Sequence, residues 1–99
     1  MFSHLIVFWT DPHNFGAPDE LLSAANELLK GIPGIVSFHA GKMVKSHRPV
    51  VEQTYSVALN IVFTDKQAEH EYQSHPQHLV FLESFVKRLV QKVVIYDFE

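Results

Sequence analysis

Cysteine is absent from this 99-residue chain. Disulfide bonds, thiolate nucleophiles and thiolate metal ligands are therefore excluded, and the composition suits a reducing compartment, so we expect a cytoplasmic protein. Positive charge is scarce as well: there are 8 Lys and Arg residues against 11 Asp and Glu residues, and the net charge is −3. Because the basic residues are scattered and form no stripe, no nucleic-acid partner is expected.

Long apolar runs and glycine-rich loops are also missing. No stretch approaches the roughly 20 apolar residues that cross a bilayer, so no membrane partner is expected. The apolar start, Met1–Trp9, lacks a basic region and a small-residue cleavage site, and we interpret it as a strand and not as a signal peptide. The four glycines form no phosphate-binding loop. With 46% apolar and 19% charged residues, the chain is typical of one globular domain over residues 1–99.

Hydrophobic periodicity predicts four strands and three helices. Runs of β-branched and aromatic residues indicate the strands, and apolar stripes with caps and proline breaks indicate the helices. The expected order is strand Phe2–Trp9, helix Pro18–Lys30, strand Val36–Lys45, strand Tyr55–Phe63, helix Asp65–Ser74, helix Pro76–Val90 and strand Gln91–Phe98. This order is typical of an α+β, ferredoxin-like domain with a four-stranded antiparallel sheet.

Both faces of the first and last predicted strands are apolar. An antiparallel sheet covered by helices on one side should carry polar residues on the other. Here, whichever face of Phe2–Trp9 meets the helices, the other still carries large apolar residues, and Gln91–Phe98 repeats the pattern. A wet patch of this kind is unusual in a monomer. The sequence therefore predicts a homodimer in which two copies pack through their open sheet faces.

The stretch Glu71–His78 concentrates the chemically capable residues. It holds a tyrosine, two histidines and a proline. Before it, Thr64-Asp-Lys-Gln67 matches a capping box with Thr64 as the N-cap. Pro76 must end that helix and can begin the next, with Ser74 or His75 as its cap. The next helix is expected to turn an apolar stripe to the core, formed by Leu79, Leu82, Phe85, Val86 and Leu89.

Several of these residues resemble the stress-responsive A/B barrel (Dabb) family. The likeness covers nearly the whole chain and rests on His4-Leu-Ile-Val7, Pro33 with Gly41, Tyr72-x-x-His75-Pro-x-His78 and Tyr96-Asp-Phe98. The Tyr-x-x-His-Pro-x-His run is its most specific part. The resemblance implies a ferredoxin-like domain whose sheet packs on that of a second copy to form a dimeric α/β barrel, in agreement with the two apolar faces.

The chain also resembles, more distantly, the olivetolic acid cyclase type of polyketide cyclase within that family. Such an enzyme closes a linear poly-β-keto thioester by an intramolecular aldol condensation without metal or cofactor. The resemblance implies Tyr72 and His78 as catalytic residues, His4 as a pocket histidine and Asp97 as a carboxylate near the chain end. Where the cyclase has a further pocket histidine, this chain has Val57, so the same substrate is not implied.

The chemistry of an aldol closure explains these residue types. A base must remove a C–H proton, and a donor must stabilise the oxyanion that follows. His78 suits the base, Asp97 could fix its tautomer by accepting from the other ring nitrogen, and the Tyr72 phenol suits the donor. A structural interpretation stays open, in which a buried pair of His78 and Asp97 caps the strand end and holds the helix break.

Other polar residues have weaker signals. His4 lies mid-strand and is either a satisfied core histidine or a pocket residue. Tyr55 and Asn60 on the third strand are candidate substrate-binding residues. His75 is expected to cap a helix. Its spacing to His78 crosses the proline break and no third ligand is apparent, so no metal is predicted.

The predicted function is that of a small stress-responsive A/B barrel protein. It is expected to bind or convert a small hydrophobic, polyketide-like molecule by cofactor-free His/Tyr acid–base chemistry. As an enzyme it would be a cofactor-independent cyclase, lyase or isomerase. The alternative is a non-catalytic dimeric protein with a ligand-binding or structural stress role. The expected partners are a second copy and a small hydrophobic ligand, and no cofactor is expected.

Overall fold

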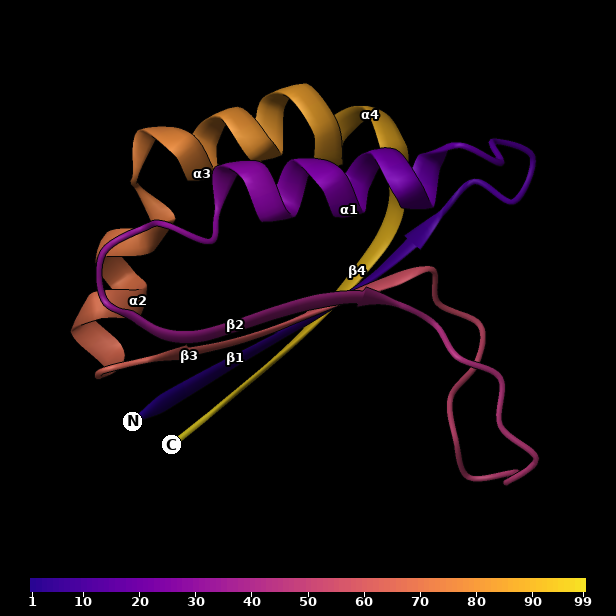
Figure 1. Cartoon of the computed structure of the whole chain (residues 1–99), viewed down its shortest axis with the longest axis horizontal. Coiled ribbons are helices and arrows are strands. Elements are labelled where there is room, and N and C mark those ends of the chain that lie inside the picture. Colours follow the sequence, from indigo (N-terminus) through magenta and orange to yellow (C-terminus); the bar gives the residue numbers. More distant parts are fainter.

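The computed structural model describes all 99 residues. In chain order the elements are β1 (Phe2–Thr10), α1 (Ala17–Leu28), β2 (Ile35–Lys42), β3 (Val57–Phe63), α2 (Lys66–Gln73), α3 (Pro76–Phe81), the π-helical segment η1 (Leu82–Val86), α4 (Lys87–Leu89) and β4 (Val90–Phe98). Figure 1 shows two layers, with α1 and the α3–α4 helix side by side above the sheet and both chain termini at the end where α2 lies.

The sheet has the strand order β2-β3-β1-β4, and every neighbouring pair is antiparallel. This confirms the predicted ferredoxin-like α+β fold. Two strands are shorter than predicted, because residues 43–56 form a loop. The Gln53 side chain holds that loop by accepting from the Ser46 N–H and donating to the Ser46 carbonyl, and Pro49 removes a donor that a strand would need.

The core lies between the sheet and the helices. Strict alternation along β1 buries every second side chain on the helix side, from Phe2 through His4, Ile6 and Phe8 to Thr10. The helix-facing residues of β3 and the apolar stripe of α1 complete the core, with Val57, Leu59, Ile61, Phe63, Leu21, Ala25 and Leu29 all at most 1% exposed. Burying a side chain of the size of leucine or phenylalanine contributes about 1.5–3 kcal/mol, so this layer stabilises the fold.

The N-terminus of α2 differs from the predicted capping box. The N-cap is Asp65 and not Thr64, because the extended backbone of Asp65 lets its carboxylate accept from the Ala68 N–H at 2.8 Å. The turn into β2 packs tightly on the same helix. Gly34 has φ +91°, and a Cβ there would lie 2.7 Å from the Ala68 Cβ. A side chain is therefore excluded at this contact.

Pro76 separates α2 from α3, as predicted. His75 has an extended backbone, and its Nδ1 accepts from the Gln77 N–H at 3.1 Å, which confirms it as the cap of α3. Pro76 occupies the first turn, where its missing N–H costs nothing. The break turns the chain so that α2 and α3 lie at an angle to each other at one end of the molecule (Figure 1).

The apolar stripe of the last helix is rotated relative to the prediction. Leu79 is 48% exposed and Leu82 37% exposed, whereas Phe81 is buried with Leu89. Two features cause this: the direction of α3 is fixed by the Pro76 break, and the π-helical segment η1 adds a residue to one turn. Leu82 consequently lies at the edge of the helix layer and not in its core.

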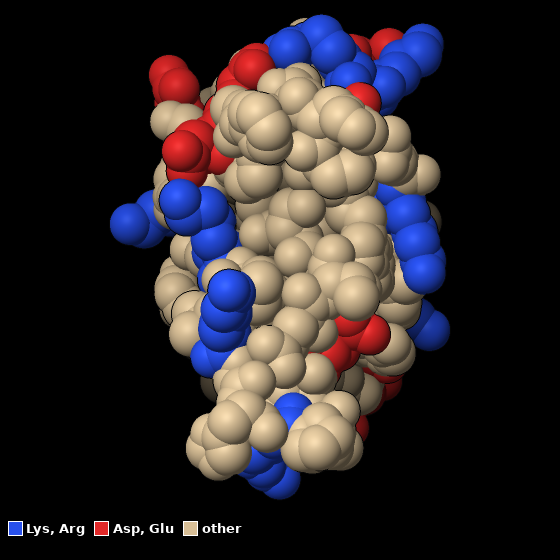
Figure 2. All heavy atoms as spheres, turned by 90° about the vertical axis from the view of Figure 1, so that its right-hand side faces the viewer, with Lys and Arg blue, Asp and Glu red and all other residues tan.

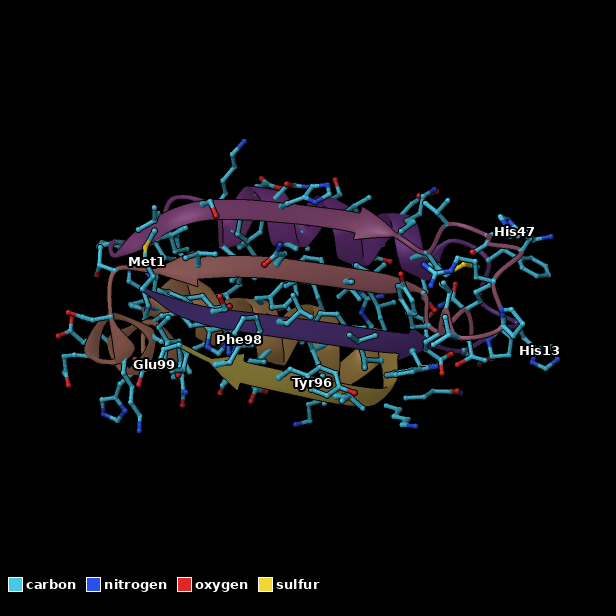
Figure 3. The ribbon with its side chains drawn as sticks, turned by 90° about the horizontal axis from the view of Figure 1, so that it is seen from below. Met1, His13, His47, Tyr96, Phe98 and Glu99 are labelled. Carbon is cyan, nitrogen blue, oxygen red and sulfur yellow. The ribbon has the colours of Figure 1, made fainter.

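The second face of the sheet has no helix over it. Figure 3 views this open face, with Tyr96 and Phe98 on β4 among its side chains. Tyr96 is 57% and Phe98 58% exposed. At the end of the molecule that carries the loops after β1 and β2, uncharged residues fill most of the middle, and Lys, Arg, Asp and Glu lie mainly toward the margins (Figure 2). None of the helices combines the length and apolar character that a membrane crossing requires.

Candidate functional site

His78 lies in the first turn of α3 with its ring half-buried. Its Nδ1 lies 2.9 Å from the backbone carbonyl oxygen of Gln73. A carbonyl oxygen can only accept, so Nδ1 of the neutral ring carries the proton and donates it. The other nitrogen, Nε2, then keeps its lone pair and makes no hydrogen bond within the chain. The helix break thus fixes the tautomer that a general base needs.

Burial lowers the pKa of His78, because the cation loses solvation in the half-buried site. The hydrogen bond to the Gln73 carbonyl raises this pKa in turn, and the neighbouring His4 lowers it. The balance leaves the pKa of His78 below its ordinary value of 6.5. The ring is therefore neutral at pH 7, which is the form that accepts a proton.

Tyr72, at the end of α2, lies against His78. The two ring centroids are 4.4 Å apart, and Tyr72 also contacts Phe63 at 5.0 Å and His4 at 5.9 Å. Burial raises the pKa of the Tyr72 hydroxyl well above its ordinary value of 10.0, and the carboxylate of Glu69 adds to the rise. The hydroxyl therefore stays protonated and serves as a donor. Since it makes no hydrogen bond to another residue, its proton is free for a ligand.

Asp97 is paired with His4 and not with His78. The strand register of β1 and β4 places His4 directly opposite Asp97, and His4 Nδ1 lies 2.5 Å from Asp97 Oδ1. The predicted pairing of Asp97 with His78 is thus replaced by two separate arrangements: a carbonyl orients His78, and a carboxylate orients His4. Both histidines nevertheless meet at Tyr72, so His4, Tyr72, His78 and Asp97 form one cluster.

Glu69 joins this cluster, although it was not predicted from the sequence. It is 5% exposed on the inner side of α2, and the side-chain amide of Gln73 donates to its two oxygens at 2.6 and 2.8 Å. Its spacing of three residues from Tyr72 places both on one face of α2. That spacing was the sequence signal from which Glu69 could have been predicted, because a carboxylate three residues before a core-facing tyrosine on a helix lies on the same buried face as the tyrosine.

Two adjoining hollows open beside the cluster. The outer one has a volume of about 340 Å³ and is lined by His4, Tyr72, Gln73, His78, Leu82, Ile95 and Asp97. The inner one, of about 110 Å³, continues between the helices and the sheet. The two hollows share five lining residues: His4, Tyr72, His78, Leu82 and Ile95. The other residues that line the inner hollow are all apolar. A ligand with a polar group at His78 and a short apolar part in the inner hollow fits this shape.

The remaining predicted site residues lie elsewhere. Asn60 lies on the open face of the sheet, opposite Leu5 of β1, and Tyr55 packs against Trp9 with ring centroids 6.4 Å apart. Both line a hollow on that face, so neither shares the pocket of His78. Val57 is fully buried in the core.

One group of side chains has the residue types and spacing of a metal site: it consists of His4, Glu69 and Asp97, whose ligand atoms lie within 4.8 Å of one another. These atoms already have partners, however. His4 bonds Asp97 directly, and Gln73 occupies the Glu69 carboxylate. The donor set is satisfied by hydrogen bonds within the chain, so we assign it the role of orienting His4 and supporting Tyr72.

Comparison with known proteins identifies relatives along the whole chain. Residues 2–99 match the model of the Stress responsive A/B Barrel Domain family. A stress-response A/B barrel domain-containing protein of Arabidopsis thaliana is 30% identical over 99 residues, which cover 98% of this chain and 84% of the plant protein.

Solved structures show the same fold. A Dabb family protein from Mesorhizobium loti, described as having a ferredoxin-like fold, superposes with a TM-score of 0.80 at 22% identity, covering 99% of this chain and 94% of the other. A dimeric ferredoxin-like protein from Thermobifida fusca superposes with a TM-score of 0.79 at 17% identity, covering 98% and 88%. Further neighbours from Bacteroides fragilis and Jannaschia are also described as dimeric. At these identities the likeness establishes the fold.

Proposed function

Because this chain belongs to the stress-responsive A/B barrel family, we propose that it binds a small, largely apolar carbonyl compound and converts it by acid–base chemistry at His78 and Tyr72. One observation carries the proposal: two residues that line one hollow each have a complementary polar group without a partner in the chain. These groups are the free Nε2 of His78 and the free hydroxyl of Tyr72.

The proposed reaction begins with proton transfer. His78 Nε2 takes a proton from the carbon next to a carbonyl, and the Tyr72 hydroxyl donates a hydrogen bond to the enolate oxygen that forms. Returning the proton to another carbon completes an isomerisation. Alternatively, the enolate carbon bonds to a second carbonyl carbon of the same molecule, and the alkoxide so formed takes the proton back from His78, which completes a ring closure. Both routes leave the protein unchanged and require no other reactant.

The alternative is a binding protein without turnover. The openness of the outer hollow favours it, since the apolar rim residues Leu82 and Ile95 are 37% and 49% exposed. An oxyanion is stabilised best where water is excluded. The same hollow would hold the ligand in this case, and His78 and Tyr72 would supply only hydrogen bonds.

Carbon-acid exchange separates the two functions without knowledge of the natural substrate. Ethyl 3-oxohexanoate is incubated with the protein in deuterated buffer at pH 7, and the loss of its C2 proton signal is followed by proton NMR. We expect acceleration over buffer, loss of the acceleration in His78→Ala and a reduction of about 10–100-fold in Tyr72→Phe. His13→Ala is the control, because His13 is an exposed loop histidine. Binding by the wild type with no exchange above buffer would establish the binding protein instead.

We further propose that two copies pair through the open sheet face. The apolar side chains on that face and the dimeric structural neighbours support this pairing. Light scattering after size exclusion should give twice the chain mass of 11.3 kDa. Val94→Lys, midway along the edge strand β4 on that face, should give the single-chain mass, whereas Leu79→Lys, on the outer helix surface, should leave the dimer intact. A wild-type monomer at micromolar concentration would refute the pairing.

A further inference from the structure

A separate hollow, distinct from the outer and inner hollows beside His78, lies on the open face of the sheet. It has a volume of about 340 Å³. Its floor is made of small residues: Gly41 of β2 lies opposite Ala58 of β3, and Val7 of β1 lies on the other side of Ala58. Because glycine and alanine stand where neighbouring positions carry large side chains, the sheet surface is depressed here.

Aromatic side chains form the walls of this hollow. Trp9, Tyr55 and Tyr96 line it, and Figure 3 shows Tyr96 on the open face of β4. The indole of Trp9 is held in place from two sides. Its N–H donates to Thr54 Oγ1 at 2.9 Å, and the Lys92 ammonium lies 4.6 Å from the ring centroid. Walls of this kind contact a flat ring over a large area.

Polar groups without partners face the same hollow. His39 and Asn60 are directly opposite each other in the β2–β3 pairing and both line it. Neither side chain makes a hydrogen bond within the chain, and the hydroxyls of Tyr55 and Tyr96 make none. Two charged side chains also line the hollow, and each has a partner within the chain: Lys42 pairs with Asp19 at 2.7 Å, and the Glu52 carboxylate accepts hydrogen bonds from the N–H and the hydroxyl of Thr54.

Sheet-to-sheet pairing would take these four groups out of water. Buried polar groups are nearly always hydrogen-bonded, and leaving one without a partner costs about 1–3 kcal/mol. These groups therefore need hydrogen-bond partners when the face is covered, and a ligand in the hollow can supply them. Amide, imidazole and phenol groups between aromatic walls are complementary to an uncharged aromatic ring that bears a hydroxyl or carbonyl group.

We propose that this hollow is a second ligand site, enclosed between the sheets of the dimer, for a small neutral aromatic molecule of the phenol class. The inference rests on the sheet-to-sheet pairing proposed above, and does not depend on the chemistry at His78. It gives Tyr55 and Asn60 a ligand-binding role in a pocket separate from that of His78.

The test uses 4-fluorophenol as the probe on the ¹⁵N-labelled full chain. Light scattering first establishes the dimer at the concentration used, so that a failure of the pairing is seen separately. On titration, the amide signals of Gly41, Ala58 and Asn60 should shift with a dissociation constant of about 1 mM, an ordinary value for a fragment of this size. Shifts confined to residues around His78, or none at 20 mM probe, would overturn the proposal.

Three variants separate ligand binding in this hollow from contacts between the copies and from the pocket of His78. Asn60→Leu keeps the size of the side chain and should weaken the probe at least about 5-fold, the loss expected for one hydrogen bond, while the dimer persists. Ala58→Phe should fill the hollow and abolish the shifts, with its fold checked by the dispersion of the amide spectrum. His78→Ala should leave the dissociation constant unchanged. If Asn60→Leu dissociates the dimer, the polar groups pair between the copies and the proposed ligand site is refuted; unchanged probe affinity in that variant refutes it as well.

Discussion

Replacing Tyr72 by phenylalanine should leave the stability of the protein almost unchanged. The hydroxyl makes no hydrogen bond within the chain and borders the outer hollow. Removing a hydroxyl that makes no hydrogen bond within the chain costs little, whereas removing one that is bonded in the interior costs about 1 kcal/mol. We therefore expect Tyr72→Phe to change the free energy of unfolding by less than about 0.5 kcal/mol.

Replacing Tyr72 by alanine should be severe by contrast. The ring is 2% exposed and packs on His78, Phe63 and His4 with centroid distances of 4.4, 5.0 and 5.9 Å. Losing an aromatic ring at such a site typically costs about 3–5 kcal/mol, because a cavity remains. That is a large part of the roughly 5–15 kcal/mol by which a domain is stable.

Urea unfolding followed by circular dichroism measures both changes. The chain concentration is held constant, since dissociation of a dimer contributes to the apparent stability. A loss above about 1 kcal/mol in Tyr72→Phe would mean that the hydroxyl is bonded in the native protein. Its proton would then be unavailable to a ligand, and the proposed donor role would be refuted.

Two further predictions concern pH and backbone conformation. Burial lowers the pKa of His78, so that as the pH falls the unfolded chain takes up a proton before the folded chain does. The stability that neutral His78 contributes above about pH 6.5 should therefore be lost as the pH falls toward the folded-state pKa. The stability difference between wild type and His78→Phe, measured by urea unfolding from pH 7.5 to 5, should shrink over that range, and a constant difference would contradict the burial argument. Gly34→Ala should lower the free energy of unfolding by about 2 kcal/mol or more, because φ at this position is +91° and the new Cβ would lie 2.7 Å from the Cβ of Ala68. The control is Gly31→Ala, whose new Cβ would meet nothing within 4 Å. Equal melting temperatures of the two variants would contradict the prediction.

The fold was predictable because its signals are local. Alternation in Phe2–Trp9, the stripe of α1 and the Pro76 break each follow from neighbouring residues, and together they permit one simple topology. The two apolar faces of β1 and β4 indicated an unpartnered sheet surface, and the structure leaves that face uncovered by helices. Element ends were less accurate, as the cap at Asp65 shows.

The detailed geometry of the site depended on information that is not local. Asp97 pairs with His4 because β4 lies beside β1 in one register, and a shift by one residue would turn Asp97 to the other face. No pattern within either strand fixes that register across 93 residues. The free Nε2 of His78 depends in the same way on a carbonyl released at the end of α2, since the final turn of a helix leaves its carbonyls without partners.

The protonation state of His78 tests the central proposal most directly. Nitrogen-15 NMR of the labelled histidine side chains distinguishes the two neutral tautomers and the imidazolium, and His78→Ala assigns the signal. At pH 7 we predict a neutral ring with its proton on Nδ1, bonded to the Gln73 carbonyl, and a pKa below 6.5. A proton on Nε2, or an imidazolium at pH 7, would leave no lone pair facing the hollow and would contradict a general base at this position.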